Sequence, residues 1–207
     1  MDTLPAEADS EVQRYAALFI DVPNIRWVNP IAADGPQQRL EVDDIDWSLL
    51  VDRMLASLEA NHFVYIGNAY LFAADGRKRT QDWLKKAMKR GLYRYHRKVN
   101  AFVRSVKDID VAIVNDIWDC FLVMLQEQRS RGKKGPLEVT ILLAGGDGAY
   151  SYPITSIRNR FDSSEVNIRL HTFSWGGSLH RELTELSEVV ELLEKGPSII
   201  KAHTHHC

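Results

Sequence analysis

The chain has 207 residues, of which 45% are hydrophobic and 26% are charged, and its formal net charge is −2. This composition is typical of a globular protein, and the length favours a single domain with one good core. The longest apolar runs, such as 139–144, are far shorter than the roughly 20 residues of a membrane helix. The acidic first residues also differ from the basic and apolar start of a secretory signal. We therefore expect a cytoplasmic protein with no membrane association.

The domain is expected to span residues 15–195, between a flexible N-terminal segment at 1–14 and a C-terminal tail at 196–207. The tail contains three histidines and Cys207, which would suit a soft metal ion. Terminal residues are usually untethered, however, so an unstructured tail with incidental histidines is the simpler interpretation. The two cysteines have no CxxC spacing, and neither a disulfide framework nor a zinc knuckle is indicated.

Apolar, strand-like runs alternate with helical patterns along the chain. Strands are expected at 16–20, 63–72, within 93–103, at 139–144 and at 166–173, and amphipathic helices at 47–58, 80–90, 108–127 and 181–193. Segments 29–44 and 130–136 contain prolines and glycines and are expected to be loops. The alternation predicts an α/β fold of Rossmann-like, three-layer form, in which a mostly parallel central sheet is flanked by helices.

Two aspartates follow the most apolar strands. Asp21 comes directly after the 16–20 strand, with Asn24 close behind it, and Asp147 follows the 139–144 strand in a glycine-rich turn. A single aspartate after a strand is usually a turn former or a helix cap. In open parallel sheets, however, ligands bind at the carboxyl ends of the strands. Two aspartates brought to that edge therefore indicate a site.

Two more aspartates lie near the start of the 108–127 helix. Asp110 stands where the helix dipole favours an acid, whereas Asp116 lies within an apolar run and needs a partner. Taken singly, the first is explained as a helix-start residue and the second as a contact of a neighbouring lysine. Their six-residue spacing turns through about 240° of a helix, so they do not share a face. Asp21, Asp110 and Asp147 are thus the expected metal ligands, with Asp116 as a weaker fourth member.

The order of these motifs resembles the NYN family, also called LabA-like, of the PIN-like ribonuclease superfamily. The resemblance spans roughly residues 15–193. It is carried by Asp21, Asn24, Lys107, Asp110, Asp116, Gly146, Asp147, Gly148 and Tyr150. It implies a PIN-like fold and a metal-dependent ribonuclease, in the first place an endoribonuclease. The implied catalytic residues are Asp21, Asn24, Asp110, Asp116 and Asp147. Carboxylate clusters of this kind suit Mg²⁺ or Mn²⁺ rather than zinc.

The chain departs from the family pattern at three places. Ala149 stands where the family carries a second aspartate, Gly145 stands where it carries a serine, and the final helix has Ser187 and Glu188 where an aspartate is common. One acidic group is therefore missing. This leaves a second interpretation open, a PIN-like RNA-binding or scaffolding module that has lost catalysis. A phosphatase for small phosphorylated molecules is a more distant alternative.

A one-sided basic segment lies at residues 77–107, with twelve Lys or Arg residues against one acid, Asp82. Charge runs are normally solvated faces, but here Tyr93 and Tyr95 are interleaved with the cations. Cations neutralise phosphates and aromatic rings stack on unpaired bases, so we expect single-stranded or structured RNA to bind here. The expected contacts are Arg77, Lys78, Arg79, Lys85, Lys89, Arg94, Arg97, Lys98 and Lys107. A homo-oligomer is compatible with the superfamily, but no surface pattern in the sequence demonstrates one.

Overall fold

A computed structural model describes residues 14–29, 38–59, 62–95, 100–132 and 135–202 of the chain, with the backbone alone for residues 93–95. In chain order the elements are β1 (Arg14–Asp21), α1 (Val22–Arg26), β2 (Trp27–Val28), β3 (Gln38–Arg39), η1 (Val42–Asp44), α2 (Trp47–Ala56), β4 (His62–Phe72), α3 (Lys78–Tyr95), β5 (Asn100–Val106), α4 (Ile109–Ser130), β6 (Leu137–Ala144), η2 (Gly148–Tyr150), α5 (Ser151–Arg160), β7 (Val166–Ser174), η3 (Gly176–Ser178), α6 (Arg181–Leu186) and β8 (Val189–Leu192).

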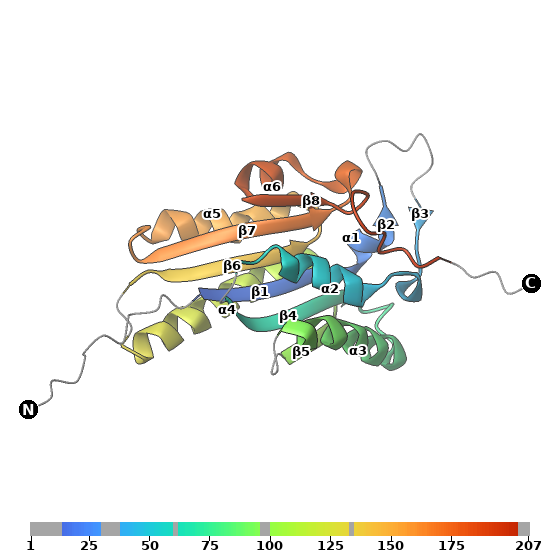
Figure 1. Cartoon of the computed structure of the whole chain (residues 1–207), viewed down its shortest axis with the longest axis horizontal. Helices are drawn as coiled ribbons and strands as arrows, with labels where there is room; N and C mark the ends of the chain where they lie inside the picture. The colour runs from blue at the N-terminus through green and yellow to red at the C-terminus, as the bar shows by residue number, and fades with distance from the viewer. Residues whose placement is uncertain (1–13, 30–37, 60–61, 96–99, 133–134, 203–207) are drawn as a thin grey trace, which may run out of the picture.

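Six strands form one parallel sheet in the order β5-β4-β1-β6-β7-β8. Helices α2 and α3 lie in front of the sheet in Figure 1, and α4 and α5 lie behind it. The predicted α/β fold, with a parallel sheet flanked by helices, is confirmed. Counted along the chain, the strand order is 3-2-1-4-5-6, so the two halves of the sheet diverge between β1 and β6. In sheets of this kind ligands bind at the divergence point, beyond the carboxyl ends of the strands.

Strand β1 divides the core in two, because its side chains alternate between the two faces of the sheet. Leu18 and Ile20 pack with α2 and α3 on the front face, whereas Ala17 and Phe19 pack with α4 and α5 on the back face. The same alternation directs Asp21, the last residue of β1, to the back face. The position of this carboxylate therefore follows from the register of a fully buried strand.

The helix expected at 181–193 is wrong in its second half. Helix α6 ends at Leu186, and β8 pairs in parallel with β7 as a sixth strand. Val189 and Val190 are β-branched and suit a strand. Without β8, strand β7 would present a row of unpaired backbone groups at the edge of the sheet. Pairing at this edge outweighs the helical spacing of the apolar residues.

Other boundaries also differ from expectation. The strand expected within 93–103 is displaced, because α3 continues to Tyr95 and β5 begins only at Asn100. Helix α5 was not expected; its Pro153 stands in the first turn, where a missing amide costs no hydrogen bond. Ile199 is fully buried, so the packed chain continues into the segment expected to be a tail. The predictions for residues 1–13 and 203–207 lie outside the described residues. Among the described residues, no helix is long and apolar enough to cross a membrane.

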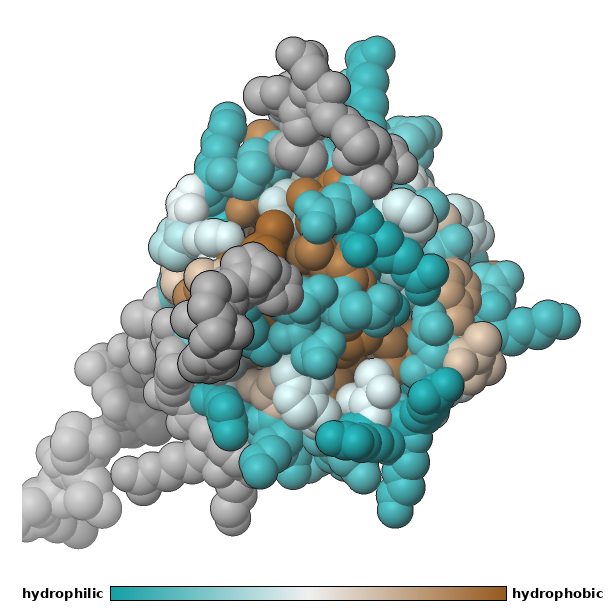
Figure 2. Space-filling model, turned by 90° about the vertical axis from the view of Figure 1, so that its right-hand side faces the viewer, coloured by the Kyte–Doolittle hydropathy of each residue, from teal (hydrophilic) through white to brown (hydrophobic). Residues whose placement is uncertain are grey.

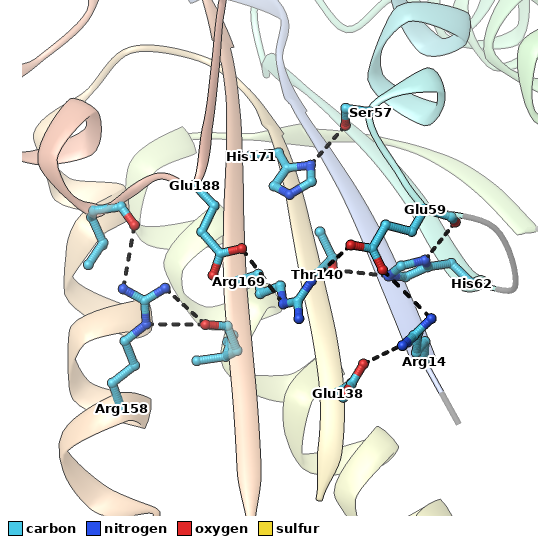
Figure 3. Close-up of polar contacts among 12 residues, drawn as sticks. Arg14, Ser57, Glu59, His62, Glu138, Thr140, Arg158, Arg169, His171 and Glu188 are labelled. Carbon is cyan, nitrogen blue, oxygen red and sulfur yellow. Dashed lines mark hydrogen bonds and ion pairs between the residues drawn. The ribbon is translucent and has the colours of Figure 1, made fainter. Parts of the chain in front are cut away.

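A polar cluster lies on the front face of β1, β6 and β7 (Figure 3). Ser57, directly after α2, lies 2.9 Å from His171 Nδ1, and Nε2 of His62 lies 3.3 Å from the Thr140 hydroxyl. Burial is the main cause that lowers the pKa of His171 to about 4, and the charges of His62 and Arg169 add to it. The neutral imidazole therefore serves as a hydrogen-bonding link that ties the end of α2 to the sheet.

Candidate functional site

The hydroxyl group of Tyr150 joins two of the predicted site residues. It lies 2.6 Å from Oδ2 of Asp21 and 2.8 Å from Oδ1 of Asp110. Asp21 ends β1, Asp110 lies in the first turn of α4, and Tyr150 ends the η2 turn that follows β6. The structure thus brings two carboxylates together at the point where the sheet diverges. In the sequence Tyr150 stands out only as part of a motif, and its hydrogen-bonding role is not evident there.

The two short contacts of Tyr150 need more than one proton. A hydroxyl group has one hydrogen to donate, and an ionised carboxylate only accepts. Burial is the main cause that raises the pKa of Asp21 to about 6, and the charges of Asp110 and Asp147 add to it, whereas hydrogen bonds from Tyr150 and the Asn24 amide oppose it. Burial also raises the pKa of Asp110. The pair therefore holds a proton more firmly than isolated aspartates do.

Asp147 lies beside this pair, but its carboxylate is engaged in its own turn. The side chain is exposed and caps η2, and Oδ1 accepts a hydrogen bond of 2.8 Å from the amide of Ala149. Its charge raises the pKa values of both Asp21 and Asp110, so it lies within electrostatic reach of them. Among the described residues, no group of three or more His, Cys, Asp or Glu side chains is arranged to hold a metal ion. Asp21 and Asp110 thus meet at Tyr150 and Asp147 lies apart from them, and the three-aspartate ligand set stays a prediction.

Two glycines allow the turn after β6 to pack closely against the segment after β7. A Cβ atom on Gly146 would lie 2.1 Å from the carbonyl oxygen of Ser178, and one on Gly148 would lie 2.7 Å from the ring of His180. Neither glycine has a positive φ. Close approach, rather than unusual backbone conformation, thus requires glycine on both sides of Asp147.

No protein-family model matches the sequence, and no curated protein sequence matches it. The fold has a counterpart among solved structures. The chain is similar to the crystal structure of VPA0982, a protein of unknown function from Vibrio parahaemolyticus, with a TM-score of 0.53 and 14% sequence identity; the match covers 89% of this chain and 96% of that one. Similarity at this level of identity shows the fold alone, and the site is therefore argued from its geometry.

Asp116 belongs to a separate polar cluster. Nη1 of Arg104 lies 2.7 Å from both of its carboxylate oxygens, and the hydroxyl of Tyr70 donates to it at 2.6 Å. The amide of Asn68 lies 3.5 Å away. The carboxylate is thus committed to β4 and β5, and its partner is an arginine rather than the expected lysine. A catalytic role for Asp116 stays a prediction.

We predict that Asp116→Asn lowers the free energy of unfolding by about 1–2 kcal/mol. The substitution removes a buried charge from its ion pair, and the half-exposed Arg104 limits the loss through solvent screening. Urea unfolding measures the change. Asp119→Asn, at an exposed position of the same helix, is the matched control and should change stability by less than about 0.5 kcal/mol. Equal stabilities for the two variants would contradict the structural role of this pair.

The basic residues are spread along α3 rather than gathered at the acidic pair. Arg77, Lys78 and Arg79 are exposed at the start of this helix, and Lys107 is exposed between β5 and α4. These positions follow the carboxyl ends of β4 and β5, so they share the edge of the sheet with Asp21. The 18 residues of α3 then run about 27 Å away from that edge. Only the beginning of the basic segment therefore lies near the site.

The remaining predicted RNA contacts lie further along α3 or outside the described residues. Lys85 and Lys89 are half-buried, and the ammonium group of Lys85 lies 5.7 Å from the ring centre of Phe102. The side chain of Arg94, and the predicted contacts at 97–98, lie outside the described residues. The contact of Lys85 and Lys89 with RNA therefore stays a prediction.

Two cavities flank α1 at this edge of the sheet. The larger, about 1050 Å³, is lined by Asn24, by the turn after β6 and by segment 177–186. The smaller, about 710 Å³, is lined by Arg26, Arg77, Arg79 and Trp83 among others. Asn24 and Arg26 are two positions apart in α1, so this short helix contributes to both cavities. Figure 2 shows this side of the molecule, where hydrophilic side chains surround a more apolar centre.

Proposed function

We propose that the chain is a metal-dependent ribonuclease that hydrolyses internal phosphodiester bonds of RNA at the Asp21–Asp110 pair. The observation that carries this proposal is the convergence of two buried or half-buried carboxylates on Tyr150 at the divergence point of a parallel sheet. The order of the surrounding motifs, which resembles the NYN family of the PIN-like superfamily, supports the same activity.

The donor set fits Mg²⁺ or Mn²⁺. Mg²⁺ usually keeps several waters and binds through one or two carboxylates together with substrate phosphates, so two converging aspartates suffice. Asp21 and Asp110 would hold the ion, and Asp147 would add negative charge from beside them. When bound, such an ion screens the charge of the phosphodiester and lowers the pKa of an attacking water.

Other residues of the chain would position the two carboxylates and the reacting groups and would neutralise phosphate charge. Tyr150 holds the two carboxylates at a fixed separation through its hydroxyl group. Asn24 follows Asp21 by three positions and lines the larger cavity, and its buried Oδ1 atom has no hydrogen-bond partner among the described residues. This oxygen is thus available to accept a hydrogen bond from a water and orient it. Lys107, exposed before α4, is placed to neutralise phosphate charge at the same edge.

Cleavage of labelled RNA tests the proposal. The protein is incubated with single-stranded and hairpin RNA in Mg²⁺, Mn²⁺ or EDTA, alongside Asp110→Asn and the exposed control Asp119→Asn. Cleavage that requires the metal, disappears in Asp110→Asn and persists in the control supports the nuclease. RNA binding without cleavage under any metal would contradict the nuclease proposal.

An RNA-binding or scaffolding module of the same fold is the second candidate. Two observations favour it: Ala149 replaces an acidic residue of the family pattern, and no three-ligand group occurs among the described residues. Under this alternative Asp110→Asn leaves RNA affinity unchanged with and without metal. Under the nuclease proposal the metal strengthens binding to the wild-type protein and not to this variant.

Reversing the charge of Arg77 and Arg79 together should weaken RNA binding by about tenfold or more at low salt. Both side chains are exposed at the carboxyl edge of the sheet, and each phosphate contact contributes to the salt dependence of affinity. Fluorescence anisotropy at several salt concentrations measures the affinity and its slope. Lys86→Glu with Arg90→Glu, exposed further along α3, is the matched control. An equal loss in both double variants would show that general charge, rather than this edge, binds RNA.

A further inference from the structure

The larger cavity beside the aspartate pair has an acidic wall. Glu182 and Glu185 line it from α6, and Asp147 lines it from the turn after β6. Among the described residues that line it there is no lysine or arginine. A phosphate group entering this cavity would meet the carboxylates of Asp147 and Glu182, whereas Glu185 is paired with Arg181 and His180 is the basic side chain in the lining. The occupant is therefore neutral or cationic and offers hydrogen-bond donors.

The same cavity has an aromatic and apolar side. Tyr152, in the first turn of α5, is 63% exposed, although large aromatic side chains usually bury most of their surface. Leu179 and Leu186 also line the cavity. An exposed aromatic ring at the mouth of a cavity is a stacking platform for a planar ring. The lining thus suits a flat heterocycle whose edge carries N–H groups.

The smaller cavity, which α1 also lines, carries charged side chains of both signs. Arg26, Arg77 and Arg79 line it together with Glu41, Asp43 and Asp75, and Arg26 is paired with Glu41 and Asp75. Arg77 and Arg79 are exposed at this edge of the sheet, where a phosphate backbone could reach them. This arrangement fits a strand whose base enters one cavity while its backbone passes the arginines.

We propose that the larger cavity binds an unpaired guanine base of the RNA, stacked on Tyr152 and read by Glu182; the proposal rests on the ribonuclease function above. Guanine presents N1–H and N2–H side by side, and a single carboxylate accepts both in a bidentate contact. Glu182 is held in place by the Ser151 hydroxyl, 3.1 Å from its Oε2 atom. The other bases lack two adjacent donors on this edge, so the cavity selects guanine at one position next to the cleaved bond.

Binding of nucleosides tests this proposal without a phosphate or a metal. Guanosine, inosine and uridine are titrated against the protein in EDTA and followed by saturation-transfer NMR. Inosine lacks the N2 amino group and is otherwise matched to guanosine. We expect saturable binding of guanosine and about tenfold weaker binding of inosine and uridine, because a bidentate contact discriminates by about this factor or more.

Variants locate the binding. Tyr152→Ala should weaken guanosine binding about tenfold, whereas Tyr152→Phe should keep it. Glu182→Gln should remove the preference for guanosine over inosine, because an amide cannot accept two hydrogen bonds through two oxygens. Phe63→Ala, which removes an aromatic side chain that is 50% exposed at the opposite end of the sheet, is the control and should change nothing.

The outcomes separate this inference from the proposed function. Equal affinity for the three nucleosides, or unchanged binding in Tyr152→Ala, overturns guanine recognition even if the protein cleaves RNA. Guanosine binding that depends on Tyr152 and Glu182 upholds the cavity's role even if no cleavage is found.

Discussion

Replacing Asp21 by asparagine should greatly reduce RNA cleavage and at the same time stabilise the metal-free protein at pH 7.5. Asp21 is 5% exposed, and burial raises its pKa from 3.8 to about 6. Its ionisation in the folded protein therefore costs free energy that a neutral amide does not incur. A shift of this size corresponds to about 3 kcal/mol. We expect a gain of about 2 kcal/mol, since asparagine does not reproduce the contact with Tyr150 equally well, and a loss of cleavage of about a hundredfold or more.

The gain should depend on pH. An acid whose pKa is higher in the folded than in the unfolded protein binds more protons when folded, so stability falls as the pH rises from about 4 to 6. His171 acts in the opposite direction: its pKa is lowered from 6.5 to about 4, so its contribution is lost as the pH falls through that range. The contribution of His171 is the same in both proteins. The difference in unfolding free energy between variant and wild type therefore reports the contribution of Asp21.

Urea unfolding in EDTA at pH 4 and pH 7.5 measures this difference, with cleavage assayed in parallel. The two proteins should be nearly equal in stability at pH 4 and should diverge above pH 6. Asp119→Asn serves as the control and should show no such divergence. An Asp21→Asn protein that is less stable than wild type at pH 7.5 would refute the cost assigned to the buried carboxylate.

The parts of the fold that the sequence predicts are those whose side-chain pattern reflects burial directly. Strands β1 and β6 are covered on both faces and therefore appear as continuous apolar runs. Strand β8 could not be recognised in this way, because its half-buried residues also fit a helical spacing. Pairing with the open edge of β7 decides its conformation, and a local sequence pattern carries no information about that edge.

The same distinction applies to the site. Asp21 and Asp110 could be placed because the end of a buried strand and the start of a long helix meet at one edge of a parallel sheet. Helix geometry also separated Asp116 from Asp110. Its pairing with Arg104, and the joining of two carboxylates by Tyr150, depend on contacts between distant segments. Such contacts follow from packing and are not encoded in spacing along the chain.

A different long-range contact should give the largest loss of stability. The side chain of Arg53 in α2 is 7% exposed and donates through Nε to Glu191 at 2.5 Å. Its two terminal nitrogens donate to the carbonyl groups of Leu192, Leu193, Lys195 and Pro197. All five N–H groups of the guanidinium are thus used. Gly196, with a φ of +95°, lets the chain turn around the charged group.

Arg53→Lys should lower the free energy of unfolding by about 3 kcal/mol, although the charge is kept. An ammonium group has three donors without the planar geometry of arginine, so buried carbonyl groups lose their partners. Arg181→Lys, in an ion pair with Glu185 whose arginine is 88% exposed, is the control and should change stability by less than about 0.5 kcal/mol. Urea unfolding gives both values, and a change below about 1 kcal/mol for Arg53→Lys would refute the argument. Hydrogen exchange should show the loss of protection first in β8, because Arg53 donates to Glu191 and Leu192 of this strand.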